Sequence, residues 1–374
     1  MTELVAPGES GARPSGGVLD NPAALGRIDR SGMATLIGGI PDQVRDAWSR
    51  SRELDLPDTH CSAGAVAVLG MGGSAIGADL VRGIWGDRLS VPIEVVRGYD
   101  LPAWVGSDDL VIASSYSGAT EETISALEAA LRRAARVAAI STGGPIAEVA
   151  RRGGLPLLMF PGGGQPRAAI GYAVTLMAGL LERAGLVVIA EEEIEEAAAE
   201  AEDAARELGP DVPTADNPAK QLAWALVDRL PVIEASGFLG PVARRWKTQL
   251  NENGKSAAVW EELPEATHNA VVGYPNPEAT RDHLEIVFLA SSLDHPRNRV
   301  RAEVSGELLD EVHVVHRTIE FERGGRFAQA LRAIVLGDFV SVYLAAIYGV
   351  DPTPVVAIDR VKGHLAASGD EDSG

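Results

Sequence analysis

The stretch AVAVLGMGGSAIGADL, at residues 65–80, predicts a strand, a glycine-rich turn and a helix in succession. Its five leading apolar residues, 65–69, match the length of a strand that is buried on both faces of a parallel sheet. Three glycines between positions 70 and 73 allow a tight turn, and Ser74 to Arg82 begins a helix. Because free backbone N–H groups at a helix N-terminus attract anions, this turn predicts a site for a phosphorylated ligand.

The same glycine turn fits two other interpretations. Gly70-Met-Gly-Gly-Ser-Ala75 satisfies the G-x-G-x-x-G/A pattern of dinucleotide-binding folds, and Glu94 lies at a suitable spacing for a ribose hydroxyl. The turn is also typical of a loop that only packs a helix against a strand. This stretch alone leaves all three interpretations open.

Composition limits the classes of function. The chain has 374 residues, of which 46% are hydrophobic, enough for two domains with a substantial core. Its formal net charge of −20 repels nucleic acid and anionic membranes, so neither is expected as a partner. The single cysteine, Cys61, excludes an internal disulfide and is typical of a reducing compartment. We expect no apolar run of the length needed to span a bilayer. The first 17 residues also lack a signal-peptide pattern, so we expect a cytoplasmic protein.

The first half alternates strand-length apolar runs with helical periodicity. Residues 1–18, rich in Gly, Pro and Ser, are predicted to form a disordered tail. The alternation beyond them predicts a right-handed βαβ arrangement with a parallel sheet. The expected strands are residues 65–69, 92–97, 109–113, 137–140 and 156–160.

The second half repeats this order. A strand at 231–235, a glycine loop at 236–241 and a helix at 242–251 are followed by strands at 284–290 and 312–319 and an apolar helix at 327–348. We therefore expect an α/β protein with two similar domains, each a parallel sheet flanked by helices in a flavodoxin-like three-layer sandwich. The expected domains are residues 19–186 and 214–374.

The segment between the halves is acidic. Residues 191–207 contain nine acidic residues among alanines, and Ile194 is their only large apolar residue. This composition favours a solvated helix that bridges two domains over an arm that binds a partner. We therefore expect a helical linker at 187–213.

A second loop distinguishes the interpretations of the glycine turn. It reads SYSGATEET at residues 115–123 and lies between a predicted strand and a helix. The hydroxyls of Ser115, Ser117 and Thr120 can converge with helix N-terminal amides on one phosphate. A capping box at Thr120 and Thr123 would explain the threonines but not the paired serines. The corresponding loops of the second half lack this chemistry, so one ligand site is expected, centred on the first domain.

Three more motifs accompany the loops Gly70–Gly77 and Ser115–Thr123: Gln165–Tyr172, Asn251–Lys255 and Leu263–Asn269. With these five motifs, the chain resembles the bifunctional phosphoglucose/phosphomannose isomerases, which are sugar isomerase (SIS) domain proteins. The resemblance implies interconversion of glucose 6-phosphate or mannose 6-phosphate with fructose 6-phosphate through an enediol, without a metal or nucleotide cofactor. It also implies that Gly73 and the hydroxyls of Ser74, Ser115, Ser117 and Thr120 bind the sugar phosphate.

The resemblance also implies the catalytic residues. Glu252 would be the base that moves a proton between C1 and C2, although by itself it is typical of a surface carboxylate at a helix end. As a base near neutral pH it would need a raised pKa and therefore burial between the domains. His268 lies in a polar, turn-like segment, and imidazole suits ring opening. The family implies that this histidine comes from the neighbouring subunit of a homodimer.

Two further residues complete the expected site. Arg167 resembles the residue that steadies the enediolate, and Lys362 resembles a late catalytic lysine, although its position also suits a solvated helix face. Two other functions remain open. A catalytically silent sugar-phosphate sensor would leave Glu252 and His268 unexplained, and a nicotinamide oxidoreductase would bind NAD(P).

Overall fold

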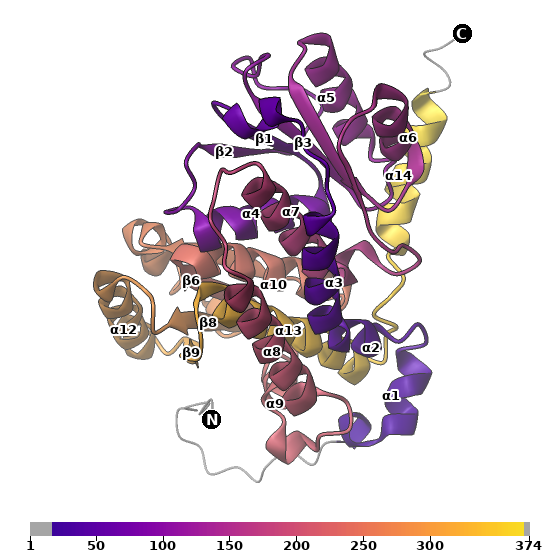
Figure 1. The fold of residues 1–374 in the computed structure, drawn as a ribbon. Coiled ribbons are helices and arrows are strands. Elements are labelled where there is room, and N and C mark those ends of the chain that lie inside the picture. Colours follow the sequence, from indigo (N-terminus) through magenta and orange to yellow (C-terminus); the bar gives the residue numbers. More distant parts are fainter. Residues whose placement is uncertain (1–16, 370–374) are drawn as a thin grey trace.

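The computed structural model describes residues 17–369 and contains two parallel sheets with helices packed around them (Figure 1). The five-stranded sheet has the order β2-β1-β3-β4-β5, and the four-stranded sheet has the order β7-β6-β8-β9. This architecture confirms the predicted α/β fold. The strands are β1 Val66–Leu69, β2 Ile93–Val96, β3 Leu110–Ser115, β4 Arg136–Ser141, β5 Leu157–Met159, β6 Leu230–Ser236, β7 Val259–Leu263, β8 Leu284–Ser291 and β9 Val315–Phe321.

The first sheet is buried on both faces, as its continuous apolar strands predict. Val66 and Val68 of β1 face a core that also includes residues of the second sheet, whereas Ala67 and Leu69 face a separate core. The shared core lies under α3 Ile40–Arg52, α4 Gly72–Trp85 and α7 Ile170–Arg183, and the separate core lies under α5 Glu121–Arg132 and α6 Gly144–Gly153.

The helices of the two halves pack against one another between the sheets (Figure 1). Helix α4 contacts α10 Gly240–Glu252 and α13 Arg326–Ile347, while α12 Pro296–Glu311 packs on the outer face of the second sheet. Because of these contacts, α4 in the first half lies near residues of the second half. The remaining helices are α1 Pro22–Ile28, α2 Met33–Gly38, α8 Glu191–Leu208, α9 Pro218–Ala225, α11 Glu278–Arg281 and α14 Val356–Gly369.

Helix α13 corrects one sequence expectation. By length and composition it could cross a membrane, with a mean hydropathy of 1.8, so the statement that no apolar run has this length is wrong. However, 89% of its apolar window is buried inside the protein. Its fully buried Asp338 accepts a hydrogen bond from Arg245. Helix α13 is therefore a core helix.

Helix α8 also differs from its prediction. It is not a solvated helix, because Ile194 and an alanine face including Ala197 and Ala201 are buried against α13 and α3. Small side chains allow this close packing. Several of its acidic residues pair with arginines from other elements: Glu195 with Arg45, Glu193 with Arg88, and Glu207 with Arg332.

Strand β7 is not predicted from the sequence, because its Glu261 and Glu262 are unusual in a strand. It lies at an edge of its sheet beside β6, and an open edge tolerates charged residues. The predicted tail mostly lies outside the described residues. Its last two residues begin a 3-10 helix, Gly17–Asp20, in which Leu19 is fully buried.

Candidate active site

The hydroxyl-bearing residues lie where β1 and β3 end. These neighbouring parallel strands present their carboxyl ends at one edge of the sheet, together with the N-termini of α4 and α5. The hydroxyls of Ser115 and Thr120 lie 2.8 Å apart, and the amide of Gly118 donates to Ser115 Oγ over 3.1 Å. Ser74 Oγ accepts from the amide of Tyr116 over 3.1 Å. The two loops therefore contact one another, and we call them together the hydroxyl site (residues 72–74 and 115–120).

The N-terminus of α5 retains its potential to bind an anion. Thr120 is the N-cap residue, but its side chain makes no capping hydrogen bond and instead contacts Ser115. The capping-box interpretation is therefore wrong. Ser117 is exposed, and its Oγ accepts from the amide of Ala119.

Glycine brings Arg167 close to the hydroxyl site. A Cβ atom on Gly73 would lie 3.0 Å from the carbonyl oxygen of Pro166 and 3.7 Å from the amide nitrogen of Arg167. A side chain here would push the Gln165–Arg167 segment away from the start of α4. Gly73 thus permits the contact that joins the hydroxyl site to Arg167.

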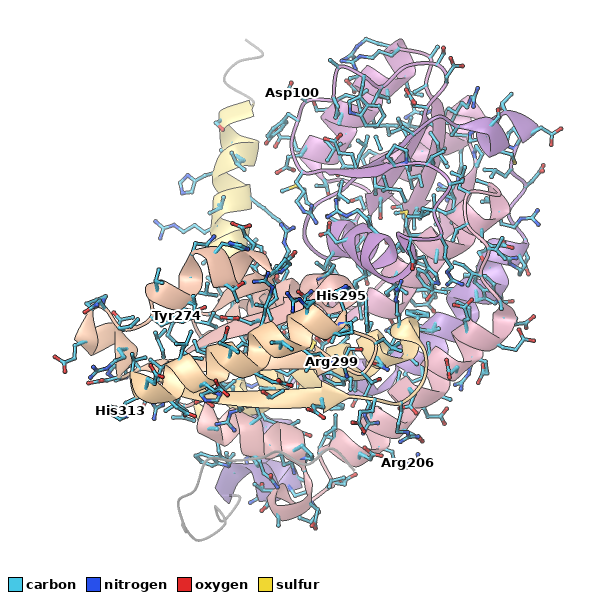
Figure 2. All side chains as sticks on the ribbon, turned by 90° about the vertical axis from the view of Figure 1, so that its left-hand side faces the viewer. Asp100, Arg206, Tyr274, His295, Arg299 and His313 are labelled. Carbon is cyan, nitrogen blue, oxygen red and sulfur yellow. The ribbon has the colours of Figure 1, made fainter. Side chains whose placement is uncertain are left out.

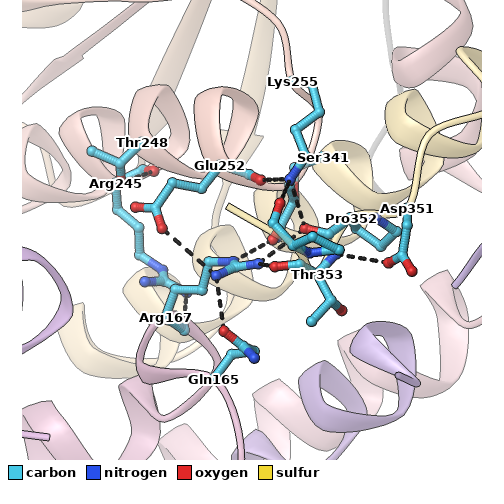
Figure 3. A network of polar contacts seen from close by, with 12 residues as sticks. Gln165, Arg167, Arg245, Thr248, Glu252, Lys255, Ser341, Asp351, Pro352 and Thr353 are labelled. Atoms are coloured by element: carbon cyan, nitrogen blue, oxygen red, sulfur yellow. Dashed lines mark hydrogen bonds and ion pairs between the residues drawn. The ribbon is translucent and has the colours of Figure 1, made fainter. Parts of the chain in front are cut away.

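Arg167 and Glu252 form an ion pair between the halves of the chain (Figure 3). Arg167 is only 5% exposed, and its Nη1 lies 3.7 Å from Glu252 Oε2. Burial lowers the pKa of Arg167, while the Glu252 carboxylate acts in the opposite direction. Glu252 ends α10, and its side chain remains 32% exposed, so the expected burial of this carboxylate is only partial.

His268 lies away from these groups. It is exposed in the 3-10 helix Glu265–His268, which follows the carboxyl end of β7. Helix α10, by contrast, starts at this edge and runs back over 13 residues, about 20 Å, to end at Glu252. Among the described residues, no hydrogen bond or ion pair joins His268 to Glu252 or Arg167. One chain does not bring the predicted histidine and base together.

Lys362 is likewise separate. It lies on α14, which stands apart from the first domain in Figure 2, and the residues from Val356 to Leu365 are exposed. Among residues 17–369, no cluster of three or more His, Cys, Asp or Glu side chains suits a metal ion.

Other residues, which the sequence pattern does not predict, surround the ion pair. Lys255 Nζ donates to the carbonyl oxygens of Glu252, Pro352 and Pro354, and burial lowers its pKa. Asn253 accepts from Arg167 Nε over 2.6 Å. Asn253 and Lys255 lie within a motif that carries the resemblance, but their spacing alone indicates no role.

Both halves of the chain are similar to known proteins. Residues 215–365 match the bacterial phospho-glucose isomerase C-terminal SIS domain. The chain is 39% identical to a bifunctional phosphoglucose/phosphomannose isomerase of Caldicellulosiruptor bescii, over 89% of this chain and 99% of the relative. It is 33% identical to the protein of the same description from Aquifex aeolicus, over 80% of this chain and 90% of the relative.

Solved structures support the fold. A hypothetical protein from Thermus thermophilus aligns with a TM-score of 0.74 and 16% identity, over 94% of this chain and 95% of that one. A glucose-6-phosphate isomerase like protein from the same organism aligns with a TM-score of 0.60 and 21% identity, over 92% of this chain and 98% of that one. From the sequence relatives, this chain belongs to the bifunctional phosphoglucose/phosphomannose isomerase family.

Proposed function

We propose that this protein interconverts glucose 6-phosphate and mannose 6-phosphate with fructose 6-phosphate. The observation that carries the proposal is the Arg167–Glu252 ion pair, which lies beside a loop rich in hydroxyls and helix N-terminal amides. Aldose–ketose isomerisation needs these three components: an anion site, a carboxylate base and a cation. Neither the described residues nor the comparisons favour the alternative of a silent sugar-phosphate sensor.

The hydroxyl site would bind the phosphate, with Gly73, Ser74, Ser115, Ser117 and Thr120 as its contacts. These groups donate hydrogen bonds to a dianion, and the N-termini of α4 and α5 add their dipoles. This local arrangement offsets the repulsion from a chain with a net charge of −20.

Glu252 would then act as the base on the opened sugar. Its carboxylate takes the proton from C2 of the aldose, the C–H electron pair forms the C1–C2 double bond, and the C1 carbonyl electrons move to O1 to give the enediolate. The hydroxyl proton of O2 then moves to O1, and return of the proton from Glu252 to C1 gives the ketose. Arg167 Nη1, 3.7 Å from the carboxylate, would stabilise the negative oxygen of the enediolate.

His268 of the partner subunit would open the sugar ring in a homodimer. Two observations support this proposal: His268 follows the carboxyl end of β7 whereas Glu252 lies at the last residue of α10, and α14 exposes Val356 and Val361 at 73% and 60%. An isolated helix of 14 residues is marginally stable in water, so α14 needs a partner surface. The same dimer would place Lys362 of one subunit at the sugar-binding site of the other.

We also propose that the chain has two domains, residues 19–186 and 214–374, which residues 187–213 connect. We further propose a cytoplasmic location, which the single Cys61 supports.

The direct test is formation of fructose 6-phosphate from each hexose 6-phosphate, with and without a chelator. We expect turnover of the wild type with either substrate and no effect of the chelator. Glu252→Gln should lower kcat about 10³-fold, because the proton acceptor is lost, yet retain the rise in Tm that fructose 6-phosphate gives. An inactive wild type, or a Glu252→Gln variant with full turnover, contradicts the proposal.

Mixing two inactive variants tests the shared site. If Glu252 and His268 come from different subunits, heterodimers of Glu252→Gln and His268→Ala contain one intact site. Random exchange between equal amounts then restores about a quarter of the wild-type activity. If the mixture stays inactive while subunit exchange is demonstrated, both residues act within one chain.

A further inference from the structure

The two asparagines that flank Glu252 make different contacts. Asn251 Nδ2 donates to the carbonyl oxygen of Ser256 over 2.8 Å, close to the helix end itself. Asn253 is fully buried; its Oδ1 accepts from Arg167 Nε over 2.6 Å, and its Nδ2 donates to Ser341 Oγ over 3.0 Å. Asn253 therefore links the guanidinium of Arg167 to α13, whereas Asn251 does not.

The other contacts of Arg167 leave one nitrogen facing the base (Figure 3). Nη2 donates to the carbonyl oxygens of Pro352 and Thr353 over 2.9 and 2.6 Å. Nη1 lies 3.3 Å from Gln165 Oε1 and 3.7 Å from Glu252. A guanidinium is planar with its donors in a fixed fork. Once Nε and Nη2 are held, the direction of Nη1 is therefore set.

The main chain of Arg167 is held from the same side. Arg245 Nη2 donates to the carbonyl oxygen of Arg167 over 2.8 Å and to Asp338 Oδ2 over 2.5 Å. Arg245 and Asp338 are 1% and 0% exposed. Since the backbone is already fixed, the orientation of the guanidinium depends on the groups that hold its nitrogens. Gln165 Oε1 lies at Nη1, whereas Nε and Nη2 are held by Asn253 and the two carbonyl groups. Of the described groups that hold Nε and Nη2, Asn253 is the only side chain.

We propose that Asn253 is a positioning residue that aims Arg167 Nη1 at the enediolate beside Glu252; the proposal rests on the function given above. Without its Oδ1, the buried Nε loses its acceptor, and the guanidinium turns toward other partners. Stabilisation of the enediolate falls, but the hydroxyl site still binds the phosphate. The cost therefore lies in kcat rather than in KM.

The test is a double-mutant cycle between Asn253→Ala and Arg167→Ala, with Asn251→Ala as the matched control. We expect Asn253→Ala to lower kcat about 10- to 100-fold with KM changed less than about threefold, since a small misplacement of a catalytic group has effects of this size. In the Arg167→Ala background it should change kcat less than about twofold. Asn251→Ala should retain kcat within about twofold.

Asn253→Asp provides the rescue, because it keeps an acceptor for Nε at the same place. It should recover most of the lost kcat. If Asn253→Ala does not fold, Ser341→Ala removes the anchor of Asn253 Nδ2, together with the hydrogen bond from Ser341 Oγ to the carbonyl oxygen of Asp338 in the same helix. It should lower kcat about threefold or more with Arg167 present and have no effect without it.

The possible failures are distinguishable. Losses that add in the double variant, or an equal loss in Asn251→Ala, overturn the role of Asn253 while an active wild type upholds the isomerase function. A wild type without isomerase activity overturns the function and, with it, this inference.

Discussion

Each sheet has an edge at which its parallel strands end, which we call the first edge in the five-stranded sheet and the second edge in the four-stranded sheet. The two edges have a similar backbone arrangement, but their hydroxyl groups make different contacts. At each edge a strand leads through a glycine with positive φ into a helical segment: Gly72, with φ +50°, follows β1, and Gly237, with φ +55°, follows β6. Ser115 ends β3 and Ser291 ends β8, and each Oγ accepts a nearby backbone N–H, from Gly118 over 3.1 Å and from Leu293 over 2.9 Å.

The second edge carries an anion of its own. Asp294 accepts from Ser236 Oγ over 2.7 Å and from the amide of Ser291 over 2.8 Å, and burial raises its pKa. At the first edge, Ser115 contacts Thr120, and no hydrogen bond among the described residues joins either hydroxyl to a carboxylate. At the second edge the carboxylate of Asp294 therefore accepts hydrogen bonds from the protein itself, whereas at the first edge the donors remain available to a ligand. This difference gives a physical reason for a single phosphate site per chain.

The largest expected effect comes from removing the hydroxyls of the first edge. Ser115→Ala combined with Thr120→Ala should lower kcat/KM by roughly 10³-fold, because two hydrogen bonds to a charged phosphate contribute about 4 kcal/mol together. Steady-state kinetics measure this loss. Ser291→Ala at the second edge is the control and should leave KM within about twofold; a comparable loss there would show that both edges bind substrate.

A second expected effect concerns the pH dependence of stability. Burial raises the pKa of Glu234 on β6 to about 7, with Glu261 adding to the rise and the hydrogen bond from Tyr274 opposing it. The corresponding strand β1 is wholly apolar. A carboxyl with a raised folded-state pKa contributes stability below its unfolded pKa, near 4.5, and loses it as the pH rises to about 7.

Glu234→Gln should therefore remove up to about 3 kcal/mol of this decline in the free energy of unfolding. Urea unfolding at pH 5 and pH 8 measures the decline in both proteins. Glu261→Gln, at a more accessible position, is the control and should change it less. An identical decline in wild type and Glu234→Gln would assign the pH dependence elsewhere.

The smallest expected effect comes from replacing the glycine with positive φ at each edge by alanine. A Cβ atom added at Gly72 or at Gly237 has no atom within 4 Å, so each substitution lowers stability only through the strain of positive φ, about 1 kcal/mol. Both should lower Tm by a similar amount. Only Gly72→Ala should also raise KM, by a few-fold, because it shifts the first amides of α4. Equal KM values in the two variants would contradict the difference between the edges.

The sequence predicts local features of the first edge well. Apolar runs of strand length that alternate with helices place Ser115 and Thr120 at a strand end, because parallel strands share that edge. Contacts of Arg167 with Asn253 and Thr353 join residues 86 and 186 positions apart, and no periodicity reports such contacts.

One signal in the sequence could have revealed part of this network. Asp338 is the only acidic residue in the apolar helix 326–347, and a buried charge requires a partner. Which arginine provides it, Arg245 in this structure, follows only from packing. Similarly, His268 and Glu252 are grouped by the family resemblance, whereas the topology of one chain separates them.

A crystal structure of the Glu252→Gln variant with bound fructose 6-phosphate measures the difference between the edges and the role of Glu252 together. The expected result has phosphate oxygens about 3 Å from the hydroxyls of Ser115 and Thr120, the side chain at position 252 about 3.5 Å from C1 and C2, and no ligand beside Asp294. A phosphate bound at the second edge, or a side chain at position 252 that faces solvent far from the sugar, would contradict it.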